Sequence, residues 1–239
     1  MERLDKILVS QNICSRKEAG KLIRQKLVKV GGEVITKPDF KLDPETCVVE
    51  LRGQALDFKK HIYLMMNKPS GVVSATEDNL DETVIDLIPD EYKRPGIFPA
   101  GRLDKDTVGL LIITDDGDFA HRLMSPKKKI YKKYYAELDK NPDENTVKAF
   151  ENGIVFRDNT KCLPAKLELL GGCRAYVEIC EGRFHQVKKM FAACEMTVKY
   201  LKRVKIGGLE LDSNLNEGEC RELSKDEQTV IFSQQIAQK

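Results

Sequence analysis

Residues 101–117 read GRLDKDTVGLLIITDDG, a charged, glycine-containing loop followed by a continuous apolar run. The run from Leu110 to Ile113 has the length and branching of a buried strand, and it ends at an Asp-Gly turn signal. We therefore expect a strand that fixes the loop before it. Asp104 is the candidate reactive group, because a carboxylate beside the cation of Arg102 stays ionised and can act as nucleophile or base. On the residues alone, a solvated hairpin loop is the favoured alternative, since loops usually carry charges.

The composition is that of an ordinary soluble globular protein, with 33% charged and 41% hydrophobic residues among 239. This length suits one large or two modest domains. The seven cysteines are scattered and contain no C-x-x-C pair, so neither a zinc cluster nor a disulfide framework is expected. No apolar run is long enough to span a membrane, and the N-terminus lacks the pattern of a signal peptide. We expect a cytoplasmic protein with no membrane partner.

The basic charge is concentrated in three segments. The formal net charge is only +2, so a nucleic-acid partner would have to bind local patches. Residues 1–41 hold ten Lys or Arg against five Asp or Glu. Residues 119–136 hold six cations and no acid, and residues 183–205 hold seven cations and one acid. These segments suit RNA phosphates, although a charge run is more often a solvated face.

The first 58 residues predict a small domain of two helices followed by strands. Leu4, Ile7 and Leu8 lie at helical spacing, and Ser15 with Glu18 forms a capping box that begins a second helix. A glycine pair then gives a two-residue hairpin signal. The segments around and after it that are expected to be strands are 27–30, 33–35 and 47–51.

The outer side of the second helix is cationic. Its exposed positive residues are expected to be Arg16, Lys17, Lys21 and Arg24. Residues three and four apart on a helix lie together, so these side chains form either one RNA-binding stripe or a solvated face. The segments RLDKILV, from Arg3, and SRKEAGKLIRQKLVKVGGEVI, from Ser15, resemble the small RNA-binding domain named after ribosomal protein four of the small subunit. The resemblance implies that residues 1–58 bind RNA.

The second domain is expected to span residues 59–239. Apolar and alternating patterns predict strands at 62–67, 110–113, 134–138, 165–169 and 175–179, and helices at 118–124, 144–152 and 187–194. Lys68-Pro69-Ser70-Gly71 follows the first of these strands. Taken alone, it is interpreted as a tight turn that reverses the chain.

Two more side chains are candidates for function. Tyr134 lies in a basic segment and could stack an RNA base, although ordinary strand packing is the favoured alternative on the residues alone. His185 lies in EGRFHQVKKMF at residues 181–191. A lone histidine is more often a structural hydrogen-bonding residue, and the three histidines of the chain supply no metal constellation.

Three separated motifs share a fixed order: KPSG at 68–71, GRLDKDTVGLL at 101–111 and EGRFHQVK at 181–188. Behind such an N-terminal domain, they resemble the type A pseudouridine synthases of the ribosomal small subunit. The resemblance implies an α+β protein whose catalytic domain has a mixed, mostly antiparallel sheet flanked by helices. It also implies that the chain isomerises a uridine of ribosomal RNA to pseudouridine, without a cofactor or a metal. A base inside a duplex cannot be reached, so the target nucleotide is expected to be flipped out.

The resemblance also implies roles for single residues. By match of motif, Asp104 is the catalytic aspartate, Tyr134 is the ring over the target base, and Lys188 is the cation paired with Asp104. Lys188 stands where many relatives have Arg, which keeps the ion pair but removes bidentate geometry. The residues expected to support the site or hold RNA are Arg102, Arg183, His185 and Gln186.

The motif at residues 184–191 is closer to the small-subunit enzymes. We therefore expect a monomer that acts on 16S-type RNA, either naked or in an assembly intermediate of the small subunit. Relatives with this architecture also modify large-subunit RNA, which is one alternative. A ribosome-assembly protein that binds RNA without catalysis is the alternative from another class. The sequence does not decide whether the aspartate adds to the sugar or removes a proton from it.

Overall fold

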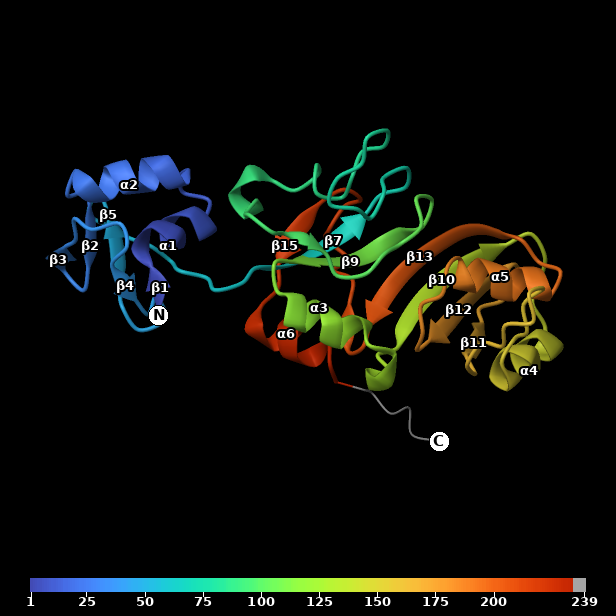
Figure 1. Ribbon diagram of the computed structural model, residues 1–239. Helices are drawn as coiled ribbons and strands as arrows, with labels where there is room; N and C mark the ends of the chain where they lie inside the picture. The colour runs from blue at the N-terminus through green and yellow to red at the C-terminus, as the bar shows by residue number, and fades with distance from the viewer. Residues whose placement is uncertain (234–239) are drawn as a thin grey trace. The chain divides into compact units, whose positions relative to one another are not determined.

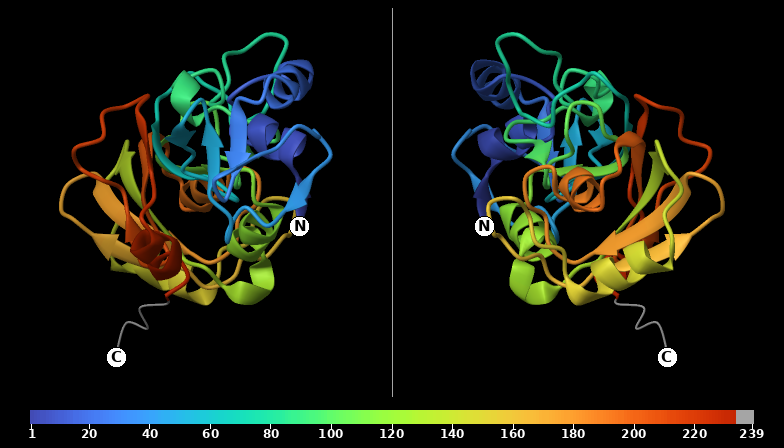
Figure 2. Two further views of the ribbon diagram at one scale, coloured as in Figure 1. Left: turned by 90° about the vertical axis from the view of Figure 1, so that its left-hand side faces the viewer. Right: turned by 90° about the vertical axis from the view of Figure 1, so that its right-hand side faces the viewer.

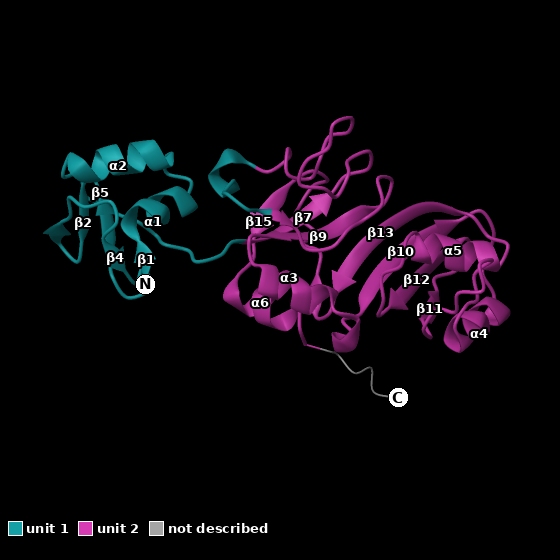
Figure 3. Ribbon diagram, in the orientation of Figure 1, with its two compact units in different colours: residues 1–62, 89–97 teal, residues 63–88, 98–239 magenta. Residues whose placement is uncertain are grey.

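The computed structural model describes residues 1–233, which divide into two compact units (Figure 3). Unit 1 comprises Met1–Ile62 and Pro89–Ile97, and unit 2 comprises Tyr63–Ile88 and the chain from Phe98 onward. The predicted boundary after residue 58 thus differs from the division after Ile62, and residues 89–97 return to unit 1.

Hydrogen bonds within unit 1 account for the return of residues 89–97. The Arg94 guanidinium donates to the carbonyl oxygen of Lys59 at 3.0 Å. The side-chain amide of Asn12 donates to the carbonyl oxygen of Asp90 at 3.4 Å. Because these donors and acceptors come from distant segments, the unit could not be delimited by a single cut in the sequence.

Unit 1 packs two helices and short strands around one apolar core (Figure 1). Its elements are β1 (Glu2–Arg3), α1 (Leu4–Ser10), α2 (Arg16–Arg24), β2 (Val28–Val30), β3 (Glu33–Val34), β4 (Lys41–Leu42), β5 (Val49–Leu51), β6 (Gln54–Ala55) and a 3-10 turn at Asp90–Tyr92. The predicted capping box is present, since the Ser15 side chain accepts from the Glu18 N–H while Glu18 accepts from the Ser15 N–H. The predicted hairpin is formed by β2 and β3, and β5 pairs with β2.

Unit 2 is built on a nine-stranded sheet with the order β11-β12-β10-β13-β9-β7-β15, to which β14 adds beside β13 and β8 beside β9. Its strands are β7 (Tyr63–Lys68), β8 (Phe98–Pro99), β9 (Val108–Thr114), β10 (Lys132–Leu138), β11 (Lys166–Leu169), β12 (Arg174–Ile179), β13 (Val198–Ile206), β14 (Leu209–Glu210) and β15 (Cys220–Glu222). Its helices are α3 (Gly117–Met124), α4 (Glu144–Asn152), α5 (Gln186–Ala193) and α6 (Lys225–Val230), with a 3-10 turn at Pro126–Lys128.

Among residues 1–233, the only pair of parallel strands in this sheet is β9 and β13. It extends over two residue pairs, Lys202 with Val108 and Arg203 with Gly109. Gly109 has a φ of +101°, and a Cβ atom there would lie 2.3 Å from the carbonyl oxygen of Arg203. The two strands can therefore approach this closely only because residue 109 has no side chain.

Helices cover the sheet in two groups (Figures 1 and 2). Against β7 and β9, a core forms in which Met65, Leu110 and Ile112 pack with Ala120 and Leu123 of α3. The second group is α4 and α5, whose buried rings Phe150 and Phe191 have centroids 5.0 Å apart. The mixed, mostly antiparallel sheet with flanking helices confirms the predicted α+β architecture. No helix among residues 1–233 has the length and apolar character that crossing a membrane requires.

Candidate active site

Asp104 lies in a loop that hydrogen bonds hold on both sides. The Ser74 hydroxyl donates to the carbonyl oxygen of Leu103 at 3.0 Å and accepts from the N–H of Leu103 at 3.1 Å. On the other side, the Thr107 N–H donates to the Asp104 carbonyl oxygen at 3.0 Å. Strand β9 begins one residue later, so the loop is fixed to a buried strand, as the sequence predicts.

Lys68, the last residue of β7, supports the same loop. Its side chain is fully buried, and its Nζ atom donates to the carbonyl oxygens of Pro69, Lys105 and Thr107 at 2.9, 3.2 and 3.1 Å. Burial lowers the pKa of Lys68 to about 8. This role was missed when KPSG was interpreted as a turn and nothing more. The available signal was a lysine at the end of a continuous apolar strand.

The carboxylate of Asp104 faces two side chains from the segment 185–188. Its Oδ2 atom lies 3.2 Å from the Lys188 Nζ atom, and its Oδ1 atom lies 3.6 Å from the His185 Nε2 atom. The side chain of Asp104 is 25% exposed, so a substrate can reach it. The contact with Lys188 expected from the motifs is therefore present, whereas the distance to His185 is too long for a hydrogen bond.

Lys188 is shared with a second carboxylate, that of Asp106. The shorter of its two contacts is the one with Asp106. Burial raises the pKa of Asp106, but the hydrogen bond and the charge of Lys188 outweigh burial, so this pKa lies below its ordinary value. Asp106 had no predicted role, because only the fold brings residue 188 to it.

The turn before α5 is held by Gln186. This side chain is 4% exposed, accepts from the Arg183 N–H at 2.9 Å and donates to Glu181 at 2.8 Å. Its predicted contact with RNA is not supported, because its amide is buried and bonded within the protein. His185 takes a left-handed conformation with φ 53°, and Arg183 pairs with Glu181 at 3.0 Å on the exposed side of the turn.

Tyr134 lies in β10 and is 8% exposed. It pairs in register with Arg203 of β13 and Val177 of β12. Arg203 is 3% exposed, and its Nε atom donates to the carbonyl oxygen of Leu110 at 2.7 Å. Its Nη2 atom has no hydrogen-bond partner among residues 1–233. Arg203 is thus a buried cation between β10 and β9, next to Tyr134, although in the sequence it is one charge among many in a basic segment.

Two members of the basic segments cannot bind surface phosphates. Lys132 is 6% exposed, and burial together with the nearby charge of Arg203 lowers its pKa to about 8. Arg203 is equally inaccessible. The prediction that these segments grip phosphates is therefore wrong for Lys132 and Arg203, because their side chains point into the protein.

The remaining predicted RNA contacts are exposed. Arg102 is exposed and has no ion-pair partner among residues 1–233. In unit 1, all four predicted cations of α2 are also exposed: Arg16, Lys17, Lys21 and Arg24. Arg16 lies 3.8 Å from the carboxylate of Asp5, and the other three leave a cationic helix face open to solvent.

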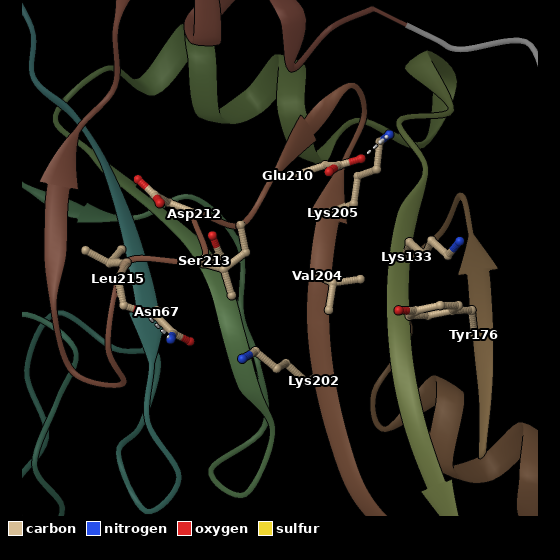
Figure 4. A pocket seen from close by; sticks show the side chains of 11 residues that line it. Asn67, Lys133, Tyr176, Lys202, Val204, Lys205, Glu210, Asp212, Ser213 and Leu215 are labelled. Atoms are coloured by element: carbon tan, nitrogen blue, oxygen red, sulfur yellow. Dashed lines mark hydrogen bonds and ion pairs between the residues drawn. The ribbon is translucent and has the colours of Figure 1, made fainter. Parts of the chain in front are cut away.

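A pocket of about 350 Å³ lies elsewhere in unit 2 (Figure 4). Its lining includes Asn67 and Lys202, each the sequence neighbour of a residue described above, Lys68 and Arg203. Because successive strand residues point to opposite faces, this pocket lies on the other face of β7 and β13. None of the predicted site residues lines it.

The geometry around Asp104 suits acid–base or nucleophilic chemistry. A partly exposed carboxylate held on a fixed loop beside an ammonium can attack an electrophilic carbon or remove a proton. Within the part of the chain that the structure describes, no three His, Cys, Asp or Glu side chains gather to hold a metal ion.

Comparison with known families gives two matches. Residues 62–193 match the RNA pseudouridylate synthase family, and residues 2–46 match the S4 domain. The first match covers the three motifs and the Asp104 loop. The second covers both helices of unit 1.

Individual proteins match over nearly the whole chain. An uncharacterised RNA pseudouridine synthase of Bacillus subtilis is 42% identical over 229 residues, covering 94% of this chain and 96% of the relative. The ribosomal small subunit pseudouridine synthase A of Escherichia coli is 40% identical over 228 residues, covering 94% and 97%. A crystal structure of a pseudouridylate synthase superposes with a TM-score of 0.67 at 37% identity, covering 97% of this chain and all of that one.

Proposed function

The chain belongs to the RNA pseudouridylate synthase family, and from that membership we propose that it converts a specific uridine of small-subunit ribosomal RNA to pseudouridine. The observation that carries the proposal is the Asp104–Lys188 contact of 3.2 Å on a loop fixed to β9. The choice of small-subunit RNA rests on the relative of that name, at 40% identity over almost its full length.

We assign the sugar chemistry to Asp104. Isomerisation breaks the bond between C1′ of the sugar and N1 of the base, turns the base, and forms a new bond from C1′ to C5. The proton on C5 is then lost and N1 takes up a proton, so that the product is an isomer of uridine. The carboxylate promotes this by adding to the sugar or by removing a proton from it. Lys188 and Asp106 position the carboxylate, since the ammonium contacts both acids.

Tyr134 is proposed to hold the base during its rotation. An aromatic ring stacks on any base and leaves the base free to turn in its own plane. The target nucleotide must leave its helix to reach this ring. We propose that Arg102 and Arg183, which are exposed, contact flanking phosphates. We also propose that unit 1 binds RNA separately through the exposed cations of α2, which are Arg16, Lys17, Lys21 and Arg24.

We also propose that the protein works as a monomer in the cytoplasm and meets its RNA in an assembly intermediate of the small subunit. Small-subunit particles and naked 16S RNA from a strain lacking this gene would be offered to the protein side by side. Faster modification of the particles supports the proposal, and equal or faster modification of naked RNA contradicts it. Light scattering of the purified protein reports its oligomeric state.

The central experiment measures tritium release from RNA labelled at C5 of uridine. Asp104→Asn should abolish release while RNA binding is retained, and the matched change Asp226→Asn, on the exposed side of α6, should leave release unchanged. Undiminished release by Asp104→Asn contradicts the assignment of the sugar chemistry.

The substrate and the alternatives are tested by mapping. Pseudouridine would be mapped in both ribosomal RNAs from cells with and without the gene. Loss of a pseudouridine from the small-subunit RNA of cells without the gene supports the proposal. Loss of one from the large-subunit RNA instead shows that the large-subunit RNA is the substrate. No lost site in either RNA, with RNA binding intact, favours a non-catalytic assembly protein.

A further inference from the structure

Phe184 is the most exposed aromatic side chain in residues 1–233, with 74% of its surface accessible. It lies at the tip of the turn that precedes α5, one residue before His185. A single exposed apolar residue is common on protein surfaces and indicates nothing by itself. What distinguishes this ring is the set of contacts on its inner side.

The inner face of Phe184 stacks on the imidazole of His185. The two ring centroids are 3.8 Å apart and the planes are inclined by 22°. The Nε2 atom of the same imidazole lies 3.6 Å from the carboxylate of Asp104. Two stacked rings therefore lead from the proposed reactive group to solvent, and the outer face of Phe184 ends the stack.

The turn that carries the two rings is held in place. Gln186 accepts from the N–H of Arg183 at 2.9 Å, and the Lys189 N–H donates to the carbonyl oxygen of His185 at 2.9 Å. His185 itself adopts φ 53°, a conformation that a non-glycine residue rarely takes and that is often found at functional sites. Because the backbone is fixed and the ring already stacks on His185, a ligand that binds the exposed ring has less side-chain freedom to remove.

One ammonium lies over the ring: the Nζ atom of Lys189 is 5.1 Å from the Phe184 centroid. The two other cations of the segment contact carboxylates, Lys188 those of Asp104 and Asp106 and Arg183 that of Glu181. An apolar partner would gain nothing from the charge of Lys189. A nucleotide unites a flat apolar base with an anionic phosphate and so complements both features.

We propose that the outer face of Phe184 stacks the base of an unpaired nucleotide next to the target uridine. The order of the stack is then the RNA base, Phe184 and His185. Lys189 contacts the phosphate next to that base. This rests on the proposed function and deepens it, because it assigns a second nucleotide position beside Asp104. Stacking alone reads no base identity, so the platform holds the RNA in register and does not select its sequence.

The chain contains no tryptophan, which provides a direct test. In Phe184→Trp the indole is the sole fluorophore of its kind, and a base stacked on it quenches its emission. The probe is small-subunit ribosomal RNA from cells lacking the gene. Thr229→Trp, on the exposed side of α6, is the matched control and should show no quenching. Both are measured in the Asp104→Asn background, so the result does not depend on turnover.

Affinity measurements complete the test. Phe184→Ala should weaken RNA binding about 10- to 100-fold, with the loss of activity appearing in KM. Phe184→Tyr should restore binding, whereas Phe184→Leu, which keeps apolar bulk without a ring, should not. Binding by Phe184→Trp without quenching, or binding by Phe184→Leu equal to wild type, overturns the inference. If the inference fails in this way but the wild-type protein still forms pseudouridine, the proposed function is unaffected.

Discussion

The Nζ atom of Lys68 lies 3.1 Å from the carbonyl oxygen of Thr107, so a fully buried ammonium ties β7 to the loop that carries Asp104. The same ammonium reaches the carbonyl oxygen of Lys105 at 3.2 Å. Two backbone acceptors of the loop thus bind a side chain that is distant in sequence, and that of Lys105 also accepts from the Gly71 N–H at 2.8 Å. Asp104 is positioned by this arrangement without touching Lys68 through a hydrogen bond.

Replacing Lys68 by Met should loosen the loop. The change removes the Lys68 donor from the carbonyl oxygens of Pro69 and Thr107, while that of Lys105 still accepts from the Gly71 N–H at 2.8 Å. Each unpaired buried acceptor costs about 1–3 kcal/mol, offset in part because a buried charge is also removed. We expect faster hydrogen–deuterium exchange at residues 103–107 and roughly 100-fold lower activity. Lys148→Met, at an exposed position on α4, is the control. If residues 103–107 exchange at the same rate in Lys68→Met as in the wild type, Lys68 does not support the loop.

The stability of the protein should respond to the ionisation of Lys68. Burial lowers its pKa from 10.5 to about 8 in the folded protein. Between these values the unfolded chain binds a proton that the folded chain has lost, so the free energy of unfolding rises with pH across this window. Urea unfolding at pH 7.5 and 9.5 should therefore show a smaller rise for Lys68→Met than for wild type. An equal rise would show that Lys68 keeps its ordinary pKa.

Gly109→Ala should disrupt the junction of β9 and β13. The added Cβ atom would lie 2.3 Å from the carbonyl oxygen of Arg203, and the φ of +101° is itself unfavourable for alanine. We expect a loss of about 3 kcal/mol or more, seen as a lower melting temperature. Gly117→Ala is the matched control, because no heavy atom lies within 4 Å of its added Cβ. Equal melting temperatures for the two variants would refute the close approach.

Asp106 should act on the reaction only through Lys188. Asp106→Asn removes the closer of the two carboxylates that hold the ammonium and should lower kcat about tenfold, whereas Lys188→Met should lower it about 100-fold. The double variant should match Lys188→Met, because one removed partner leaves nothing for the other to position. If the decrease in kcat of the double variant equals the product of the two single decreases, Asp106 has a separate role.

Local sequence signals predicted much of the fold. Capping residues mark the start of α2, and the range 144–152 expected for α4 is observed. These signals work because a helix start or a glycine hairpin depends on residues close in sequence. The longest strand, β13, was missed. Four cations among its nine residues obscure the alternation, and only pairing on both sides with β10 and β9 buries Arg203.

The residues of the candidate site likewise fall into two groups, those that the sequence could indicate and those that only the fold reveals. Asp104 could be singled out from its own loop, and the motif resemblance supplied Lys188 and Tyr134. Lys68, Asp106 and Arg203 could not be assigned, because their partners lie in other segments of the chain. A buried lysine or arginine looks like any surface cation until the fold shows which backbone carbonyls it reaches.

The two-pair junction of β9 and β13 also has a consequence for biosynthesis. Asp104 precedes this junction on the β9 side, while Lys188 comes from the helix before β13, and Lys188 and Asp106 are 82 residues apart. Contacts of such long range form late, after the local hairpins and helices. A nascent chain can therefore fold its N-terminal unit and expose the cations of α2 well before the last part of the reactive centre has been translated. The reactive centre can therefore form only after the segment from Lys188 through β13 has been translated, whereas the cations of α2 are available earlier.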